Sequence, residues 1–356
     1  MTRYALLARL AVRRRVMKPL TVAAVLGALA IACAAALATT PGTNGQITFR
    51  RWFNQAQTRS AIFTMNADGT NIRRITHAPR HTHDDQADWA PDAKQLAFTR
   101  FPDNGPAFID IVGADGSGLR QVTPRCNRKP LPNAVPAGCE DAANVSFTPD
   151  GQHLAFSRAT GRVKHFPRFM WDQIEHSAVA IIGVDGSGQR EILRLPRYSG
   201  DANFPQISPD GRFIVFERDN SPLSKPQLGI ALFVMNADGS GLHRVTPWNL
   251  RAGDNPDWAP DSSRILFHSG VDVENARSQY YTVRPDGSGL TQLTHFGTRR
   301  RLFSASFSPD GRQIIFARAD SSGNGDIWIM NADGSDPHPV QQAKPADSAP
   351  DWGSAG

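Results

Sequence analysis

The chain has 356 residues, of which 40% are hydrophobic, so it can bury the core of one large domain or of two ordinary ones. Its formal net charge is +6, and residues 1–44 alone contain six basic residues and no acidic residue. The rest of the chain is therefore neutral, which excludes a general attraction to nucleic-acid phosphates. Glycine (30 residues) and proline (26 residues) are frequent, and this favours many short elements joined by turns.

The N-terminal segment has the order of a secretory signal. Basic residues up to Lys18 precede an uncharged stretch rich in Ala, Leu and Val over 19–38, and a polar spacer follows. Ala36-Leu37-Ala38 fits the small-x-small pattern of a cleavage site. We therefore predict that residues 1–44 are an export signal and spacer, and that residues 45–356 form a periplasmic or other extracytoplasmic domain.

Three fates of this segment stay open. Arg13-Arg14 resembles a twin-arginine signal, which would export the protein in the folded state instead of through the general secretory route. Ala32-Cys33 resembles a lipoprotein acceptor site, which would attach a lipid to Cys33. An apolar stretch of about 20 residues is also long enough to remain as an uncleaved membrane anchor.

Two short motifs alternate along the rest of the chain. In the first, an aromatic or apolar anchor precedes a Pro-Asp turn and a strand that ends in Phe, as in Trp89-Ala90-Pro91-Asp92 followed by 95–98. The second reads Asn-Ala-Asp-Gly in its fullest copies, and both motifs combine the residues that tight turns require. The anchors are Trp89, Phe147, Ile207, Trp258, Phe307 and Trp352, and the second motif has its Asp at Asp68, Asp115, Asp185, Asp238, Asp286 and Asp333.

Each pair of motifs accounts for four short strands within about 50 residues, which is the size of one propeller blade. We predict an all-β fold, a six-bladed β-propeller of four-stranded antiparallel blades. The sixth copy ends after Trp352 without its second strand, and residues 45–50 match the second strand of the next copy, at 94–100. We therefore predict that the N- and C-terminal strands pair and close the ring.

These two motifs, spread over essentially all of residues 45–356, resemble the repeat of the TolB family. The resemblance implies a six-bladed propeller that binds proteins of the cell envelope, with a Pal-like lipoprotein as one such partner. TolB proteins carry a separate α/β domain ahead of the propeller, whereas only the predicted signal precedes Gly45 here, so roles that require that domain are not implied. We expect a monomeric protein-binding scaffold.

Polar residues recur in the loops that lead into the anchor strands. These loops should open on one face, around the mouth of the central channel. A ring of carboxylates there would hold a cation or dock a basic peptide segment, but each Asp would equally well cap its own loop. The candidate binding residues are His81, His83, Asp85, Asp88, Asp141, Asn144, Asp201, Asn203, Asp254, Asn255 and Asp347.

Within this set, His81, His83 and Asp85 suit a divalent cation best. Some propellers with similar repeats are metal-dependent pectin-fragment lyases, so the alternative function is a carbohydrate lyase or a small-ligand-binding propeller. We expect no enzyme, no catalytic residue and no cofactor other than such a cation. The sequence has no Gly-x-Ser-x-Gly elbow, and a peptidase domain of the dipeptidyl-peptidase type would need more chain after the last blade.

Two features lie outside the repeat. The insertion at 161–177 is rich in aromatic and basic residues, among them Arg168 and Trp171. Such residues anchor interfaces, although they would also pack back on the propeller as a lid. Cys126 and Cys139 bracket a loop without a strand pattern, and we predict that they form a disulfide in an oxidising compartment.

Overall fold

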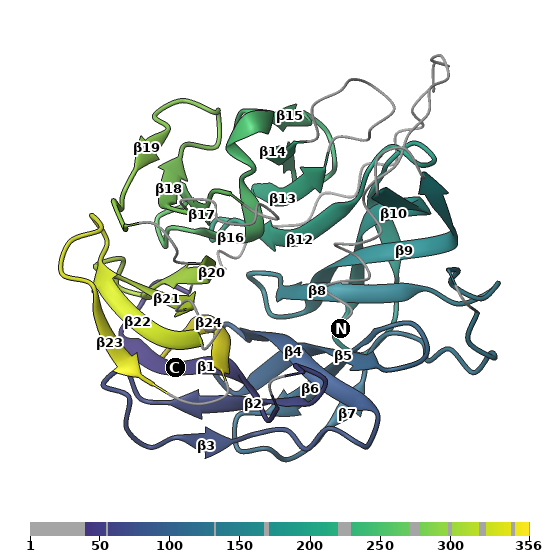
Figure 1. The fold of residues 1–356 in the computed structure, drawn as a ribbon, viewed down its shortest axis with the longest axis horizontal. Helices are drawn as coiled ribbons and strands as arrows, with labels where there is room; N and C mark the ends of the chain where they lie inside the picture. The colour runs from purple at the N-terminus through teal and green to yellow at the C-terminus, as the bar shows by residue number, and fades with distance from the viewer. Residues whose placement is uncertain are drawn as a thin grey trace.

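The computed structural model describes residues 40–54, 56–131, 133–166, 171–219, 229–270, 278–297, 301–319, 325–342 and 346–355, and it describes only the backbone of residues 165, 166, 171 and 172. These residues form six antiparallel sheets of four strands each, arranged as blades around a central axis (Figure 1). The predicted six-bladed β-propeller is thus confirmed. In this part of the chain we find no helix that is long and apolar enough to span a membrane.

The strands of each blade run outward from the axis in sequence order, apart from the first blade, whose inner strand comes from the C-terminus. The first blade contains β24 (Ala346–Ser354), β1 (Asn44–Trp52), β2 (Ser60–Met65) and β3 (Arg73–Arg74). The second contains β4 (Thr82–Trp89), β5 (Gln95–Pro102), β6 (Phe108–Gly113) and β7 (Arg120–Gln121). The third contains β8 (Asp141–Phe147), β9 (His153–Phe166), β10 (Trp171–Gly183) and β11 (Arg190–Arg194).

The other half of the ring repeats this arrangement. The fourth blade contains β12 (Ala202–Ile207), β13 (Phe213–Asp219), β14 (Ile230–Asn236) and β15 (His243–Arg244), followed by a short 3-10 helix, η1 (Trp248–Leu250). The fifth contains β16 (Gly253–Trp258), β17 (Ile265–His268), β18 (Tyr280–Val283) and β19 (Thr291–Gln292). The sixth contains β20 (Arg301–Phe307), β21 (Gln313–Ala319), β22 (Gly325–Asn331) and β23 (His338–Gln341).

The ring closes as the sequence predicts. Strand β1 pairs antiparallel with β24, and Ile47 lies opposite Trp352. The indole N–H of Trp352 donates to the carbonyl of Gly45 at 3.3 Å, and the Ala355 N–H donates to the Thr43 carbonyl at 2.8 Å. The closure places β1 inside the first sheet and leaves β24 as its inner strand, equivalent to the inner strands of the other blades.

The apolar core lies between neighbouring blades. Each second strand contains a Phe that is buried to 2% exposure or less, and in the cluster between the second and third blades Phe156 packs with Ile109 and Ile111. Full burial of such a side chain contributes roughly 2–3 kcal/mol. The equivalent side chains are Phe49, Phe98, Phe156, Phe216, Phe267 and Phe316.

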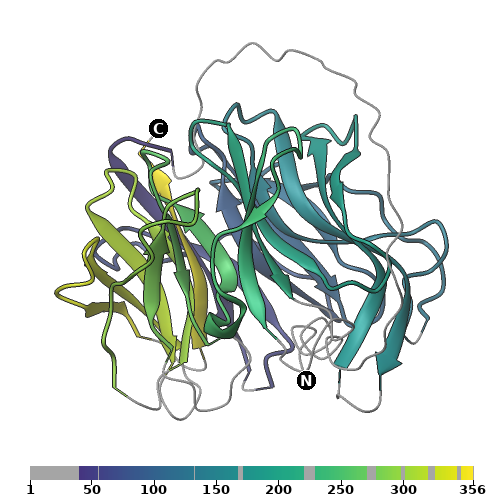
Figure 2. The ribbon, with the colours of Figure 1, turned by 90° about the horizontal axis from the view of Figure 1, so that it is seen from above.

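The two faces of the disc differ in how the strands are connected. The turns that join the first strand to the second and the third to the fourth all lie on one face, which we call the turn face. The connections from the second strand to the third, and from each blade to the next, lie on the opposite face, the loop face. The C-terminus lies on the turn face, where the Ser354 hydroxyl donates to the carbonyl of Pro91 in the turn between β4 and β5. Figure 2 shows the C-terminus on one side of the disc.

Candidate functional site in the channel and on the loop face

Every inner strand carries a β-bulge shortly before its anchor residue. The pairing between β4 and β5 shifts between Asp85 and Asp88, and equivalent shifts occur in the other five blades. Non-glycine residues adopt positive φ at most of these bulges, for example Asn144 (φ 57°) and Asn255 (φ 68°). Asn and Asp tolerate this conformation best, which explains in part why they recur in these strands.

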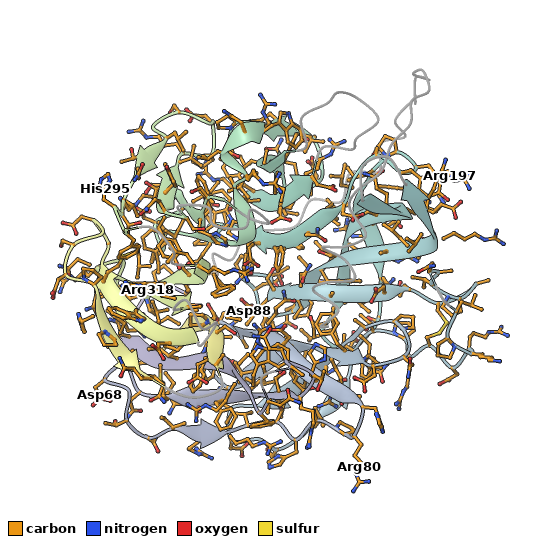
Figure 3. The ribbon with its side chains drawn as sticks, viewed as in Figure 1. Asp68, Arg80, Asp88, Arg197, His295 and Arg318 are labelled. Atoms are coloured by element: carbon orange, nitrogen blue, oxygen red, sulfur yellow. A yellow bond between two sulfur atoms is a disulfide. The ribbon has the colours of Figure 1, made fainter. Side chains whose placement is uncertain are left out.

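The bulges surround a narrow pocket on the propeller axis, lined by residues of all six inner strands. The space is about large enough for one water molecule. Three carboxylates, Asp88, Asp257 and Asp351, line it, and Figure 3 shows Asp88 near the centre of the ring (Figure 3). The other lining residues are Gln86, Ala87, Asn144, Val145, Gln206, Asn255, Ala305, Ser306 and Ala349.

The three channel carboxylates fasten neighbouring blades to one another. Each accepts a hydrogen bond from the backbone N–H of an anchor residue in the next blade: Asp88 from Phe147 at 2.7 Å, Asp257 from Phe307 at 2.7 Å and Asp351 from Trp89 at 3.1 Å. Burial raises the pKa of Asp88 well above its usual value, and the charge of Asp351 raises it further. Burial and the neighbouring negative charge both disfavour the ionised form of this carboxyl group.

Two buried ion pairs flank the closure on the loop face. The guanidinium of Arg51 forms two hydrogen bonds to Asp347, at 2.8 and 2.7 Å, and the Asp347 side chain is fully buried. Arg50 of the first blade reaches Asp85 in the second blade and also donates to the Ser348 hydroxyl. Burial raises the pKa of both Asp85 and Asp347, and the neighbouring arginine opposes this rise in each case.

A third ion-pair network lies within the second blade. Arg100 donates to Asp84 at 2.7 and 3.0 Å and lies 2.8 Å from Asp110. Burial raises the pKa of Asp110 to about 6, and the charge of Arg100 lowers it only in part. In the third blade, Arg158 bridges Glu140 and Glu191 in the same manner.

The candidate residues in the third and fourth blades also form hydrogen bonds with other residues of the propeller. Asp141 accepts the N–H of Ala107 at 2.6 Å, and the N–H of Asn144 donates to the Thr99 hydroxyl at 3.0 Å. Asp201 is buried and its N–H donates to the Asp219 carboxylate. Burial raises the pKa of Asp201 well above its usual value, with a further contribution from Asp219. The neighbouring candidate Asn203 is half-buried.

In the fifth blade, Asp254 pairs with a histidine. Its carboxylate lies 3.2 Å from Nε2 of the buried His268, and its N–H donates to Glu217 at 2.6 Å. Its neighbour Asn255 accepts a long hydrogen bond, 3.5 Å, from the side chain of Gln206. Both residues therefore link the fifth blade to the fourth.

The three residues proposed for a metal lie in different surroundings. His81 is exposed, with its Nδ1 3.1 Å from Asp103. The ring of His83 is buried and stacks on Phe101 with 5.0 Å between ring centroids, while Asp85 pairs with Arg50. Among the described residues, no group of three or more His, Cys, Asp or Glu is arranged to hold a metal ion.

The remaining predicted features are placed as follows. Cys126 and Cys139 are joined by a disulfide, with 5.2 Å between their Cα atoms. Arg168 lies outside the described residues, as does the side chain of Trp171. The insertion that contains them joins β9 to β10 in the third blade.

Sequence reasoning missed the arginines that neutralise the loop-face carboxylates. Their signal is an Arg placed two residues after the buried Phe of the second strand, in five of the six blades. In three of these blades the arginine pairs with a carboxylate at the inner end of the same blade. The five residues are Arg51, Arg100, Arg158, Arg218 and Arg318.

No protein-family profile matches the chain. Among curated proteins, it is 31% identical over 98 residues to the Tol-Pal system protein TolB of Anaeromyxobacter dehalogenans, and 26% identical over 125 residues to dipeptidyl-peptidase 5 of Porphyromonas endodontalis. These matches cover 28% and 35% of this chain, but only 21% of the TolB and 17% of the peptidase.

Solved structures cover much more of the chain. TolB from Acinetobacter baumannii matches with a TM-score of 0.60 and 16% identity, over 87% of this chain and 67% of that one. A putative TolB from Agrobacterium tumefaciens (TM-score 0.54, 18% identity) matches over 84% of this chain and 89% of its own, and an oligogalacturonate lyase in complex with manganese (0.52, 12%) over 87% and 78%. These similarities show the fold: the chain is a TolB-like six-bladed propeller.

Proposed function

We propose that this TolB-like propeller is an exported binding module that holds a protein partner of the cell envelope on its loop face, and that it is not an enzyme. The observation that carries the proposal is the bonding of the loop-face carboxylates. Asp85 and Asp347 pair with arginines, and Asp141 accepts a backbone N–H. Their charges thus serve to fix a preformed surface rather than to transfer protons, and a preformed surface lowers the entropic cost of binding.

The loop face is favoured over the turn face because its connections differ from blade to blade. The turn face consists of near-identical tight turns, whereas the loop face carries the 102–107 connection, the disulfide-bonded loop and the long β9–β10 hairpin. Irregular loops held on a rigid scaffold are where proteins usually place specific recognition. The curated TolB relatives belong by name to the Tol-Pal system, so a Pal-like lipoprotein is the first partner to test.

The location is part of the proposal. Residues 1–44, which are basic and then apolar, support export, with the propeller in the periplasm. Fusing residues 1–44 to alkaline phosphatase, which is active only outside the cytoplasm, tests this point. An inactive fusion would refute export, and a fusion in which 19–38 carries two added lysines is the matched negative control.

The binding role is tested by site-specific photo-crosslinking in intact cells. A photoreactive residue replaces Asp103 on the loop face or Asp92 on the turn face, both of which are partly exposed carboxylates. We expect one discrete adduct from position 103, identified by mass spectrometry as an envelope protein, and none from position 92. The same adducts from both positions, or none from either, would refute the assignment to the loop face.

The lyase similarity does not support a second function. At 12% identity it indicates only the fold, and His81 is exposed while His83 is buried in an aromatic stack.

A further inference from the structure

The third blade carries a projection that the other described blades lack. Its second and third strands, β9 and β10, have 14 and 13 residues, whereas the equivalent strands elsewhere have 4–9. Segments on both sides widen this extension. The disulfide-bonded loop pairs with β9 through Val135 N–H to Gly161 O (2.9 Å) and Val163 N–H to Asn133 O (2.8 Å). On the far side, Tyr198 N–H donates to Glu175 O at 3.2 Å.

Further contacts brace this extension. The Cys126–Cys139 disulfide closes the outer loop, and the Glu175 carboxylate accepts the Arg162 N–H at 3.0 Å and pairs with Arg197. Gly161 has φ 87°, and a Cβ there would lie 2.8 Å from the Cβ of Glu175, so the close crossing at this point requires glycine. We call residues 125–131, 133–135, 161–164, 173–176 and 197–198 the basic platform.

Basic side chains dominate this surface. Six cationic residues lie in the platform segments against a single carboxylate, Glu175, whose pKa is lowered by the Arg162 N–H and by Arg197. The guanidinium of one of the six, Arg125, lies over the Phe108 ring of the second blade. Lys164 and Arg197 both lie over the Tyr198 ring, at 5.4 and 5.2 Å from its centroid, and Figure 3 shows Arg197 at the outer edge. Leu131 adds an apolar side chain that is 51% exposed. The cationic residues are Arg125, Arg128, Lys129, Arg162, Lys164 and Arg197.

We propose that the basic platform binds an acidic, extended peptide segment of a partner protein; this inference rests on the proposed function and assigns its partner class. Arg162 and Lys164 project from the same side of β9, about 6.8 Å apart along the strand. Alternate carboxylates of an extended peptide have the same spacing, so a Glu-x-Glu segment matches the two cations side by side. Leu131 and Tyr198 offer apolar contacts that a peptide can also use.

A peptide fits these observations better than a nucleic acid. The chain after residue 44 has no net charge, so it lacks the general attraction to a phosphate backbone on which nucleic-acid binding depends. The aromatic ring is already covered by two cations, which leaves less of it for stacking a base or a sugar.

The test uses the full chain and a fluorescent octapeptide of four Glu-Thr repeats as the probe, with binding followed by anisotropy at low and at physiological salt. The platform variant Arg128→Gln, Lys129→Gln, Lys164→Gln removes three exposed charges that lie outside the Arg197–Glu175 pair. The matched control, Arg73→Gln, Lys94→Gln, Arg284→Gln, removes three exposed charges from the turn face. We expect the platform variant to bind about tenfold more weakly and the control less than about twofold. Thermal melts verify that both variants fold.

A second variant tests the bracing. Replacing Cys126 and Cys139 by Ser should weaken probe binding without changing any charge, because the loop that contributes Arg128 and Lys129 is released. Undiminished binding would mean that the bracing has no role in recognition, and this would overturn the platform as a built site.

Three results would overturn the proposal as a whole. These are no binding of the probe by the native chain, equal losses in the platform and control variants, or selective binding of polygalacturonate or phosphatidylglycerol vesicles in place of the peptide. The result of the peptide-binding test can be distinguished from the result of the photo-crosslinking test of the proposed function. A crosslinked envelope partner with no probe binding refutes only this inference, whereas probe binding with no crosslinked partner refutes only the loop-face scaffold.

Discussion

Aspartate residues have opposite surroundings on the turn face and on the loop face. On the turn face, the exposed Asp238 accepts hydrogen bonds from the N–H and the hydroxyl of Ser240, two residues away. These hydrogen bonds lower the pKa of Asp238. On the loop face, Asp347 is buried, pairs with Arg51 almost three hundred residues away in sequence, and has a pKa raised by burial. The first arrangement is local and repeats around the ring, whereas the second joins the two ends of the chain.

The aspartates of the two faces therefore have different structural roles, which the amino-acid composition alone cannot distinguish. An exposed capping carboxylate contributes little stability, because water replaces most of what it provides. A buried carboxylate is costly unless its cation stays in place. The loop face is therefore the region in which single substitutions should have large consequences, and the turn face the region that tolerates them.

The largest effect is expected when a buried carboxylate loses its cation. Arg51→Met leaves Asp347 buried without its partner, which should lower the free energy of unfolding by about 3–5 kcal/mol in urea titrations. The control is Arg212→Met, whose partner Asp210 lies in a turn, with an expected loss under about 1 kcal/mol. Equal losses would contradict the distinction between the faces.

Removal of the disulfide on the loop face should cause the second-largest loss of stability. The bridge closes a short loop, with a sequence separation of 13, so replacing both cysteines by serine should cost up to about 3 kcal/mol in a chain-entropy estimate. The loss should appear as faster hydrogen exchange in 133–135 before global unfolding is affected. Unchanged exchange in this segment would show that the disulfide does not hold the loop against β9.

The pH dependence of stability should reveal the buried carboxyl of Asp110. Its folded-state pKa of about 6 lies above the ordinary value of 3.8, so its contribution to stability is present in full below about pH 4 and is lost as the pH rises through 6. Asp110→Asn should therefore flatten the stability profile between pH 4 and about 6.5, with a gain of about 1–2 kcal/mol at pH 8. An unchanged slope would show that Asp110 is ionised throughout.

The smallest effect is expected on the turn face. Asp238→Ala removes the hydrogen bonds to Ser240, so Tm should fall less than in Arg51→Met or in the variant without the disulfide. Because hydrogen bonding lowers the pKa of Asp238 below 3.8, its stabilising contribution is present at neutral pH and is lost only as the pH falls through that lowered pKa. A large fall in Tm, measured beside Arg51→Met, would reverse the proposed ranking of the two faces.

The features that the sequence predicted correctly are those encoded within one repeat. The Pro-Asp and Asp-Gly turns, the buried Phe of each second strand and the missing strand after Trp352 sufficed for the six blades and for the pairing of β1 with β24. Each depends on local backbone preferences or on apolar burial, which short motifs reveal directly.

The candidate site was only partly predictable, because its contacts cross between blades. The recurring Asp residues were visible, but the partners that decide their state, such as Arg50 for Asp85 and the Phe147 N–H for Asp88, lie one blade away. His81 and His83 are separated by one residue in the sequence, yet one is exposed and the other buried, because His81 precedes β4, with φ 62°, whereas His83 lies within the strand. Their role in ligand binding stays a prediction, as does that of the other channel-mouth residues.

Hydrogen-exchange mass spectrometry decides whether the partner binds on the loop face. The envelope partner identified by crosslinking is purified and added in excess to the propeller. We expect new protection in loop-face segments such as 102–107 and 195–201, with no change in the turn-face segments 66–70 and 236–240. Protection confined to the turn-face segments would contradict the claim that this propeller binds its partner through the loop face.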